Sequence, residues 1–466
     1  MGAKRQNIQL ELAFAAEVRG EAPSAVGGGT EVPRAGCGTE SLAERERLME
    51  RVCERENVAE ALRRVMGNKG APGVDGMRVE ELPGYLAEHW PRIEEQLLSG
   101  TYKPRPVRRV EIPKRGGGRR KLGIPTALDR LIQQAVLQVL QPRWDPTFSE
   151  HSFGFRPGRS AHQAIAQAQE YIAEGYRWVV DVDLEKFFDR VNHDKLMSLV
   201  AGREKDKRLL KLVRAFLEAG IMEEGLVSSG DAVRPTEGTP QGGPLSPLLS
   251  NLLLDLLDRE LERRGHRFVR YADDCNIYVR SERAGRRVMV SITRFIERKL
   301  KLKVNREKSG VDKVHRLSFL GFSFTAGKTL KRRIAGGSVE RFKERVREIT
   351  QRTRGRSLEG VVAELARYLR GWIEYYGFCQ TPWVLRRLDG WVRRRLRSLA
   401  WVQWRGGRRR YAELRRLGVS RERAHKASSS SRGPWRLSHT GAVQVGLSEE
   451  YLHSLGLISL AARVEA

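Results

Sequence analysis

Two pairs of aspartates, each beside an apolar segment, constrain this chain more than any other feature. Asp181 and Asp183 close a segment too apolar to be an exposed strand, which predicts a buried strand with an acidic end. Asp273 and Asp274 lie within residues 266–281, where alternation on both sides of the pair predicts a hairpin with the acidic residues at its tip. If the two acidic ends lie side by side, their carboxylates supply the hard oxygen ligands that divalent cations prefer.

Such a cluster suits chemistry at phosphate. Two Mg²⁺ ions roughly 4 Å apart can activate an attacking 3′-hydroxyl and stabilise a leaving pyrophosphate. A purely structural role is the alternative for Asp273 and Asp274, because aspartates are common in solvent-exposed turns. One of Asp181 and Asp183 can instead form an ion pair with a neighbouring arginine. The residues alone leave these interpretations open.

Two further segments fit a site that handles phosphate. Residues 108–125 predict two short strands joined by a glycine-rich basic turn, and such a hairpin can fold over a triphosphate. Its basic residues are Lys114, Arg119, Arg120 and Lys121. The alternative is a solvated basic turn. Residues 239–247 form a Gly/Pro-rich loop that permits close backbone approach to a nucleotide, although many helices begin with this composition.

The charge balance predicts a polyanionic partner. The 466 residues include 86 Lys and Arg against 57 Asp and Glu, a net charge of +29, and 40% hydrophobic residues are enough for buried cores. Four scattered cysteines exclude a disulfide framework and a Cys-x-x-Cys zinc site. The chain has no apolar run that could span a membrane and no signal-peptide pattern at its start, so we expect a cytoplasmic protein with no membrane partner.

Composition divides the chain into four parts. Residues 1–40 are rich in Gly, Pro and Ala and are expected to be mobile. Residues 41–330 alternate between helical and strand patterns, and residues 331–427 predict a basic helical domain. Residues 428–466 begin with a serine-rich segment that predicts a linker to a small final module.

Within the long second part, three segments have clear patterns. Residues 126–144 and 244–265 predict amphipathic or buried helices, and residues 314–324 predict a strand.

The basic helical part carries most of the charge. Residues 331–436 contain 29 basic and 9 acidic residues and six of the nine tryptophans. An apolar stripe at helical spacing runs from Leu358 to Tyr376. The aromatic rings can stack on unpaired bases, but Trp372, Trp391 and Tyr376 lie on apolar faces, which favours a place in the core.

Seven sequence blocks resemble those of reverse transcriptases and follow the same order. They are IPKRGGGRRKLGIP, HSFGFRPGRSAHQA, VVDVDLEKFFDRV, EGTPQGGPLSPLLSNLLL, FVRYADD, LKVNREKS and FLGF. More narrowly, the chain resembles proteins encoded by bacterial group II introns, because NKGAPGVDG and FGFRPGRSAHQA lie outside the common polymerase core. It has no paired Cys-x-x-Cys motifs, so it resembles the form without an HNH endonuclease domain, which primes from nicked DNA or a replication-fork strand.

The resemblance implies an α/β right-hand polymerase with fingers and palm, an α-helical basic thumb or maturase domain, and a small C-terminal DNA-binding module. The implied function is RNA-directed DNA polymerase activity that copies group II intron RNA, together with binding of that RNA to assist splicing and mobility. The implied partners are intron RNA, an RNA template with a DNA primer, dNTPs and target DNA. A homodimer is also compatible, as is association with the bacterial nucleoid during action on DNA.

The resemblance also assigns the acidic residues. Asp183, Asp273 and Asp274 fall on the catalytic carboxylates that hold two Mg²⁺ ions. Asp183 is preferred over Asp181 because the family motif Asp-Leu-Glu-Lys-Phe-Phe-Asp begins at Asp183.

Five other residues correspond to the nucleotide site of the family. Lys114 and Arg120 match residues that hold the triphosphate, and Gln241 matches a glutamine of the nucleotide pocket. Phe188 falls where an aromatic ring excludes a 2′-hydroxyl, and Lys308 matches a basic residue near the active site.

The FLGF block corresponds to the turn that grips the primer end. Its residues are Phe319, Leu320, Gly321 and Phe322.

Two alternatives remain at this stage. One is a free-standing enzyme of the same type adopted by the host, for example for DNA repair synthesis. The other is an RNA-splicing chaperone with a decayed polymerase site, and intact Asp183, Asp273, Asp274, Arg120 and Gln241 argue against it.

Overall fold

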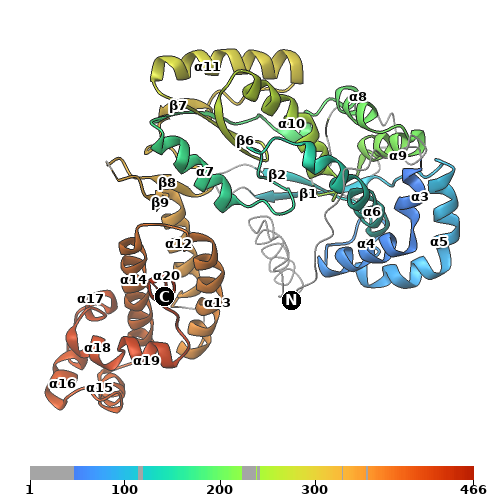
Figure 1. Cartoon of the computed structure of the whole chain (residues 1–466). Helices are drawn as coiled ribbons and strands as arrows, with labels where there is room; N and C mark the ends of the chain where they lie inside the picture. The colour runs from blue at the N-terminus through green and yellow to red at the C-terminus, as the bar shows by residue number, and fades with distance from the viewer. Residues whose placement is uncertain are drawn as a thin grey trace, which may run out of the picture. The chain divides into compact units, whose positions relative to one another are not determined.

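A computed structural model shows a chain of two compact units (Figure 1). One unit ends at Asp312 and the other begins at Lys313. The structure describes residues 47–113, 119–222, 238, 242–327, 329–352 and 355–465. The predicted mobile segment 1–40 and the predicted nucleotide-site residues Lys114 and Gln241 lie outside this part, as does the side chain of Arg120.

Four helices gather at one end of the first unit (Figure 1). They are α3 (Leu48–Cys53), α4 (Arg55–Gly67), α5 (Leu82–Leu98) and α6 (Ala127–Trp144). The helix predicted over 126–144 is confirmed, and Thr126 caps it because its hydroxyl accepts a hydrogen bond from the Asp129 amide. The helices bury apolar faces against one another in a core that continues beneath the sheets.

A small sheet carries the predicted basic hairpin. Its strands are β1 (Val107–Pro113), β2 (Arg119–Ile124) and β4 (Ile221–Met222), in the order β2-β1-β4. β1 and β2 pair antiparallel from Arg108 opposite Ile124 to Pro113 opposite Arg119, which confirms the two strands predicted within residues 108–125. The turn predicted between them, residues 114–118, lies outside the described residues.

A four-stranded sheet forms the centre of the first unit. Its strands, in the order β5-β6-β3-β7, are β5 (Arg267–Tyr271), β6 (Asp274–Val279), β3 (Trp178–Val182) and β7 (Gly310–Lys313). Both predicted features, the buried strand and the hairpin with an acidic tip, are confirmed. β6 pairs antiparallel with both β5 and β3.

Helices cover both faces of the sheet, so β3, β5 and β6 are largely buried. α10 (Ser246–Arg263) and α11 (Glu282–Phe295) share a core with Val180 and Ile277. On the other face, Tyr278 meets Tyr171 of α7 (Ala161–Ala173), with the ring centroids 5.8 Å apart. Because side chains alternate along a strand, residues 179, 181 and 183 share the face that α7 covers.

The remaining elements of this unit are short. They are α8 (His193–Arg203), α9 (Lys207–Leu217), the single helical turns Val79–Glu81, Asp145–Thr147 and Phe187–Asp189, and a π-helical end to α11 over Ile296–Leu300.

The strand predicted over 314–324 is wrong for most of its length. Only β8 (Phe322–Phe324) is a strand, paired with β9 (Arg332–Ile334). The chain reverses just before β8, where the Phe319 amide donates to the Phe322 carbonyl and the Phe322 amide to the Phe319 carbonyl. This reversal needs left-handed backbone at Leu320 (φ 49°) and Gly321 (φ 80°), which apolar patterning does not reveal.

The second unit is otherwise helical (Figure 1). Its long helices are α12 (Gly336–Ile349), α13 (Leu358–Tyr376) and α14 (Pro382–Gln403). Six short helices follow: α15 (Gly407–Arg416), α16 (Arg421–Ser428), α17 (Pro434–Leu437), α18 (Gly441–Gly446), α19 (Glu449–Ser454) and α20 (Ala462–Glu465). The apolar stripe of α13 is buried from Leu358 to Ile373, including Trp372, as its spacing predicts. Tyr376 and Trp391, which were also expected in the core, are half-buried. Within the described residues, no helix is long and apolar enough to cross a membrane.

One buried carboxylate ties the last residues to α14. Asp389 accepts hydrogen bonds from the amides of Leu460 (2.9 Å) and Ala461 (3.0 Å) and from the Ser459 hydroxyl (2.9 Å). Its side chain satisfies backbone donors that would otherwise lie buried and unpaired.

We predict that Asp389→Ala loosens this terminus without unfolding the helices. An unmade buried hydrogen bond costs about 1–3 kcal/mol, so the amides of Leu460 and Ala461 should exchange with solvent roughly tenfold to a hundredfold faster. Hydrogen exchange resolved by residue measures this. Asp389→Asn, which keeps one acceptor oxygen, should give a smaller change, and unaltered exchange in both variants would contradict the assignment.

Candidate active site

The two predicted acidic ends meet at one end of the four-stranded sheet. Val182 pairs with Cys275 and Asp181 with Asn276, so the next step of the register brings Asp183 beside Asp274. Tyr271 pairs with Asp274, which leaves Ala272 and Asp273 as a two-residue turn. The structure therefore brings together all three predicted catalytic carboxylates.

The carboxylates act on one another electrostatically. Burial, together with the negative charges of Asp273, Asp181 and Asp183, raises the pKa of Asp274 to about 7 against the opposing charge of Lys308. Burial and the charge of Asp183 raise the pKa of Asp181 to about 6. Like charges are thus gathered where solvent screens them poorly.

The loop after α11 fixes the backbone of Asp183. The Asp183 amide donates to the Ser309 hydroxyl at 2.9 Å, and its carbonyl accepts from the Asn305 amide at 2.8 Å. The Lys308 ammonium lies 3.8 Å from the Asp183 carboxylate, so the structure also places this predicted residue at the site. The basic side chain beside Asp183 is therefore that of a lysine and not of an arginine, and this lysine side chain is largely exposed.

The donor set fits a hard divalent cation, because it consists of carboxylate oxygens. Across the part of the chain that the structure describes, no three His, Cys, Asp or Glu side chains converge closely enough to hold a metal ion as they stand. A bound cation would offset the mutual repulsion that, with burial, raises the pKa values of Asp274 and Asp181.

A buried arginine that we did not predict from the sequence holds the acidic turn. The Arg270 guanidinium is 1% exposed and pairs with Asp258 of α10, which is 0% exposed. It donates two hydrogen bonds to Asp258 (2.8 and 2.6 Å) and one each to the Asn251 side chain (3.0 Å), the Ser152 hydroxyl (2.8 Å) and the Ala272 carbonyl (2.8 Å). All five N–H donors of the guanidinium are used. The available signal was an arginine that interrupts the apolar residues Phe268, Val269 and Tyr271.

The loop 151–154 completes this support. The Phe153 amide donates to the Arg270 carbonyl and the Arg270 amide to the His151 carbonyl, both at 2.9 Å. The Asn251 side chain donates to the Gly154 carbonyl at 2.9 Å. A Cβ on Gly154 would lie 2.2 Å from the Ala272 amide nitrogen, so only glycine lets the loop lie this close to the acidic turn. Ala272 itself has left-handed backbone (φ 56°).

Phe188 lies five residues beyond Asp183, in the helical turn Phe187–Asp189. Its ring is half-buried and packs edge-on to Phe187, with the centroids 5.1 Å apart. Gly238 lies close to this turn in space, since a Cβ at Gly238 would be 3.5 Å from the Phe188 carbonyl oxygen. The segment that carries Phe188 is thus held from two sides.

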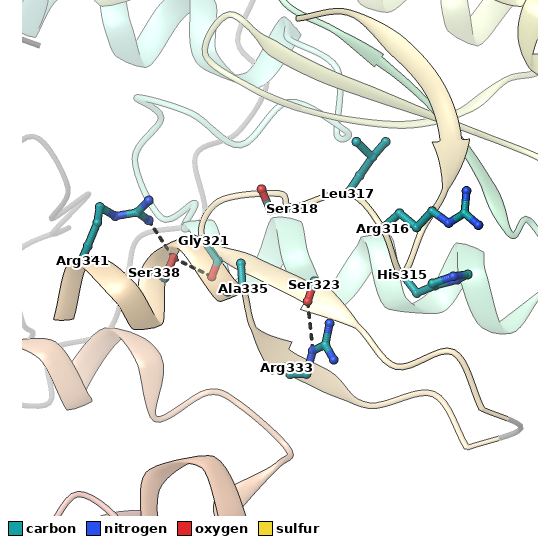
Figure 2. Close-up of a pocket in the computed structure, with 12 residues that line it drawn as sticks. His315, Arg316, Leu317, Ser318, Gly321, Ser323, Arg333, Ala335, Ser338 and Arg341 are labelled. Carbon is teal, nitrogen blue, oxygen red and sulfur yellow. Dashed lines mark hydrogen bonds between the residues drawn. The ribbon is translucent and has the colours of Figure 1, made fainter. Parts of the chain in front are cut away.

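The predicted primer-grip turn, Phe319–Phe322, belongs to the second unit, and its carbonyls are fixed by neighbouring helices. Tyr375 donates its hydroxyl hydrogen to the Leu320 carbonyl at 2.7 Å. Figure 2 shows the Ser338 hydroxyl donating to the Gly321 carbonyl (3.1 Å) and accepting from Arg341 (2.7 Å).

A basic pocket lies beside this turn. Its volume is about 270 Å³, and Figure 2 shows its arginines, Arg316, Arg333 and Arg341, with His315. Arginine forks suit phosphate oxygens, so the turn adjoins a surface fit for a nucleic-acid backbone.

Comparison with known proteins identifies two regions. Residues 112–324 match the reverse transcriptase (RNA-dependent DNA polymerase) family, and residues 339–418 match the group II intron maturase-specific domain. Protein YkfC of Escherichia coli K12 is 33% identical over 334 residues, which cover 63% of this chain and 85% of YkfC. The group II intron-encoded protein LtrA of Lactococcus lactis subsp. cremoris is 38% identical over 200 residues, covering 43% of this chain and 32% of LtrA.

Likeness to solved structures is weaker. The match to a chain of the partial Cas6-RT-Cas1–Cas2 complex covers 54% of this chain and 43% of that chain, with a TM-score of 0.34 and 24% sequence identity. The match to LtrA also spans only about a third of that protein.

We predict that Arg270→Gln strongly destabilises the first unit. Breaking a buried ion pair from one side leaves an uncompensated charge and typically costs about 3–5 kcal/mol. Urea denaturation followed by circular dichroism measures the loss. Arg286→Gln is the matched control, because Arg286 pairs with Glu282 on the exposed surface of α11 and its loss should leave the midpoint unchanged. Equal midpoints for the two variants would contradict the role of Arg270.

Proposed function

The chain belongs to the reverse transcriptases and maturases of group II introns, and on that premise we propose that it copies intron RNA into DNA at the acidic end of its central sheet. The family makes it an RNA-directed DNA polymerase with a maturase-specific domain that supports a role in intron splicing. The observation that carries the proposal is the meeting of Asp183, Asp273 and Asp274 at one sheet end.

In this proposal, Asp183, Asp273 and Asp274 hold two Mg²⁺ ions. When bound, these ions supply activation of the primer 3′-hydroxyl and neutralisation of charge on the leaving pyrophosphate. The chain's own part is to keep the carboxylates in place: Ser309 and Asn305 fix the backbone of Asp183. Arg270 fixes the turn that carries Asp273.

The incoming nucleotide is proposed to lie between this site and the basic hairpin. Lys114 and Arg120 bind its triphosphate, and Gln241 lines its pocket. The position of Lys308, 3.8 Å from Asp183, supports a part for this lysine in balancing charge at the triphosphate. Phe188 closes the pocket against a 2′-hydroxyl, which favours deoxynucleotides.

The primer end is proposed to rest on Phe319, Leu320, Gly321 and Phe322. Fixed carbonyls and the adjoining arginine pocket support this role, since a rigid turn beside a phosphate-binding surface can hold a strand without reading its bases.

The later part of the chain is proposed to bind the other nucleic acids. Residues 331–427 clamp intron RNA to assist its splicing, and residues 428–466 contact target DNA during intron mobility. The excess of basic over acidic residues within residues 331–436, 29 against 9, supports the RNA-binding role because backbone contacts dominate such affinity.

We predict that Asp273→Asn abolishes DNA synthesis on RNA. Losing one metal-binding carboxylate removes several kcal/mol of transition-state stabilisation, so primer extension with Mg²⁺ and dNTPs should fall roughly a thousandfold or more. RNA binding, measured alongside, should stay at the wild-type level. Extension by neither protein, with RNA binding intact, would refute the polymerase proposal. Full extension by the variant would refute the role of the carboxylate.

We predict that Phe188→Ala weakens sugar discrimination. Removing the ring opens space for a 2′-hydroxyl, and steric discrimination of this size is worth roughly 10- to 200-fold. Single-nucleotide incorporation with rNTP and dNTP measures the ratio of kcat/KM values. Phe187→Leu, in the buried neighbour, is the control for general disturbance of this segment. An unchanged ratio in Phe188→Ala would remove the proposed role of the ring.

A further inference from the structure

The second unit contains a second basic cavity, on the face of α14. Its volume is about 470 Å³. α14 contributes Trp391, Arg393, Arg394 and Arg397 to its wall, and the segment that follows contributes His439, Gln444 and Glu449. Nothing in the proposed polymerase site uses these residues.

The arginines of this cavity are held in place by their own contacts. Arg393 pairs with Glu449 at 2.7 Å, and Arg397 donates to the Leu447 carbonyl at 2.8 Å. Arg394 stacks over the Trp435 ring, 4.1 Å from its centroid, and donates to the Trp435 carbonyl. The donors are therefore oriented before any ligand arrives, which lowers the entropic cost of binding.

The charge of the cavity favours an anion. Its wall carries three arginines and one glutamate. Burial lowers the pKa of Arg397, and the charge of Arg393 lowers it further against the opposing charge of Glu449. A phosphate placed here would meet two guanidinium forks and relieve their repulsion.

The cavity is larger than a phosphate needs. Its volume falls in the range of pockets that hold drug-sized ligands, roughly 300–1,000 Å³. Trp391 presents an indole ring whose position is fixed by Arg347, 5.7 Å from the ring centroid. The Gln444 amide, 3.3 Å from the His439 ring nitrogen, adds directional polar groups to the lining of the cavity. Aromatic rings and directional polar groups together are the features that bind an unstacked base.

We propose that this cavity binds one unpaired nucleotide of a structured RNA. The base lies against Trp391 with its edge toward His439 and Gln444, and the adjoining phosphate lies on Arg393 and Arg397. The inference rests on the proposed function for its choice of RNA, because Trp391–Arg397 falls inside the region that matches the maturase-specific domain.

The test uses the full chain and two RNA hairpins that differ by one bulged nucleotide, with 2-aminopurine at the bulge. Wild type should bind the bulged hairpin at least about fivefold more tightly than the paired one, and the 2-aminopurine fluorescence should change on binding. Arg397→Ala and the double variant His439→Ala with Gln444→Ala should lose this preference. Arg387→Ala is the matched control: it removes one exposed charge from the same helix at a residue that does not line the cavity, and it should keep the preference.

The outcomes separate the inference from the proposed function. A bulge preference that survives in both cavity variants overturns the inference, as does an equal preference for the same bulge in a DNA hairpin. Primer extension on an unstructured RNA template is measured on the same proteins. Loss of the bulge preference with extension retained supports the cavity as a separate RNA site. If the wild-type protein does not extend the primer, the result counts against the polymerase proposal. The bulge comparison then tests by itself whether the cavity binds an unpaired nucleotide.

Discussion

The ion pair between Arg270 and Asp258 is the contact on which the proposed active site depends. Two charges with almost no exposure to solvent are costly to bury, and that cost is offset only because every guanidinium donor finds an acceptor. The acceptors belong to α10, to the loop at Ser152 and to the Ala272 carbonyl. One side chain therefore joins α10 and the loop at Ser152 to the turn that carries Asp273.

This support explains how the chain can keep like charges together. Burial, together with the mutual charges of the cluster, raises the pKa values of Asp181 and Asp274, and such a cluster tends to separate unless the backbone around it is rigid. The strand register fixes the positions of Asp183 and Asp274. Gly154 lets the loop 151–154 pack directly against the turn that carries Asp273. The second unit follows the same rule at Asp389, where one buried carboxylate holds the end of the chain.

The sequence predicted those parts of the site that depend on local pattern. Alternation around Asp273 revealed the hairpin, and the apolar run before Asp183 revealed the buried strand. The partners of Arg270 escaped prediction because Ser152 lies 118 residues away, and a pairwise contact of that kind leaves no periodic trace. The apolar pattern predicted a strand through the reversal at Leu320 and Gly321, because the flanking residues are apolar, whereas the family resemblance predicted a turn there. Family resemblance, rather than pattern, supplied the roles of Phe188 and Lys308.

The central claim is that Asp183, Asp273 and Asp274 form one cation site at the end of the central sheet. The most direct test is a crystal structure with an RNA template, a dideoxy-terminated DNA primer, a dNTP and Mn²⁺ in place of Mg²⁺, in which anomalous scattering locates the metal ions. The account predicts two anomalous peaks within coordination distance of Asp183 and of the Asp273–Asp274 turn, beside the triphosphate. An ordered triphosphate with no metal at these carboxylates, or metal bound at another site, would contradict it.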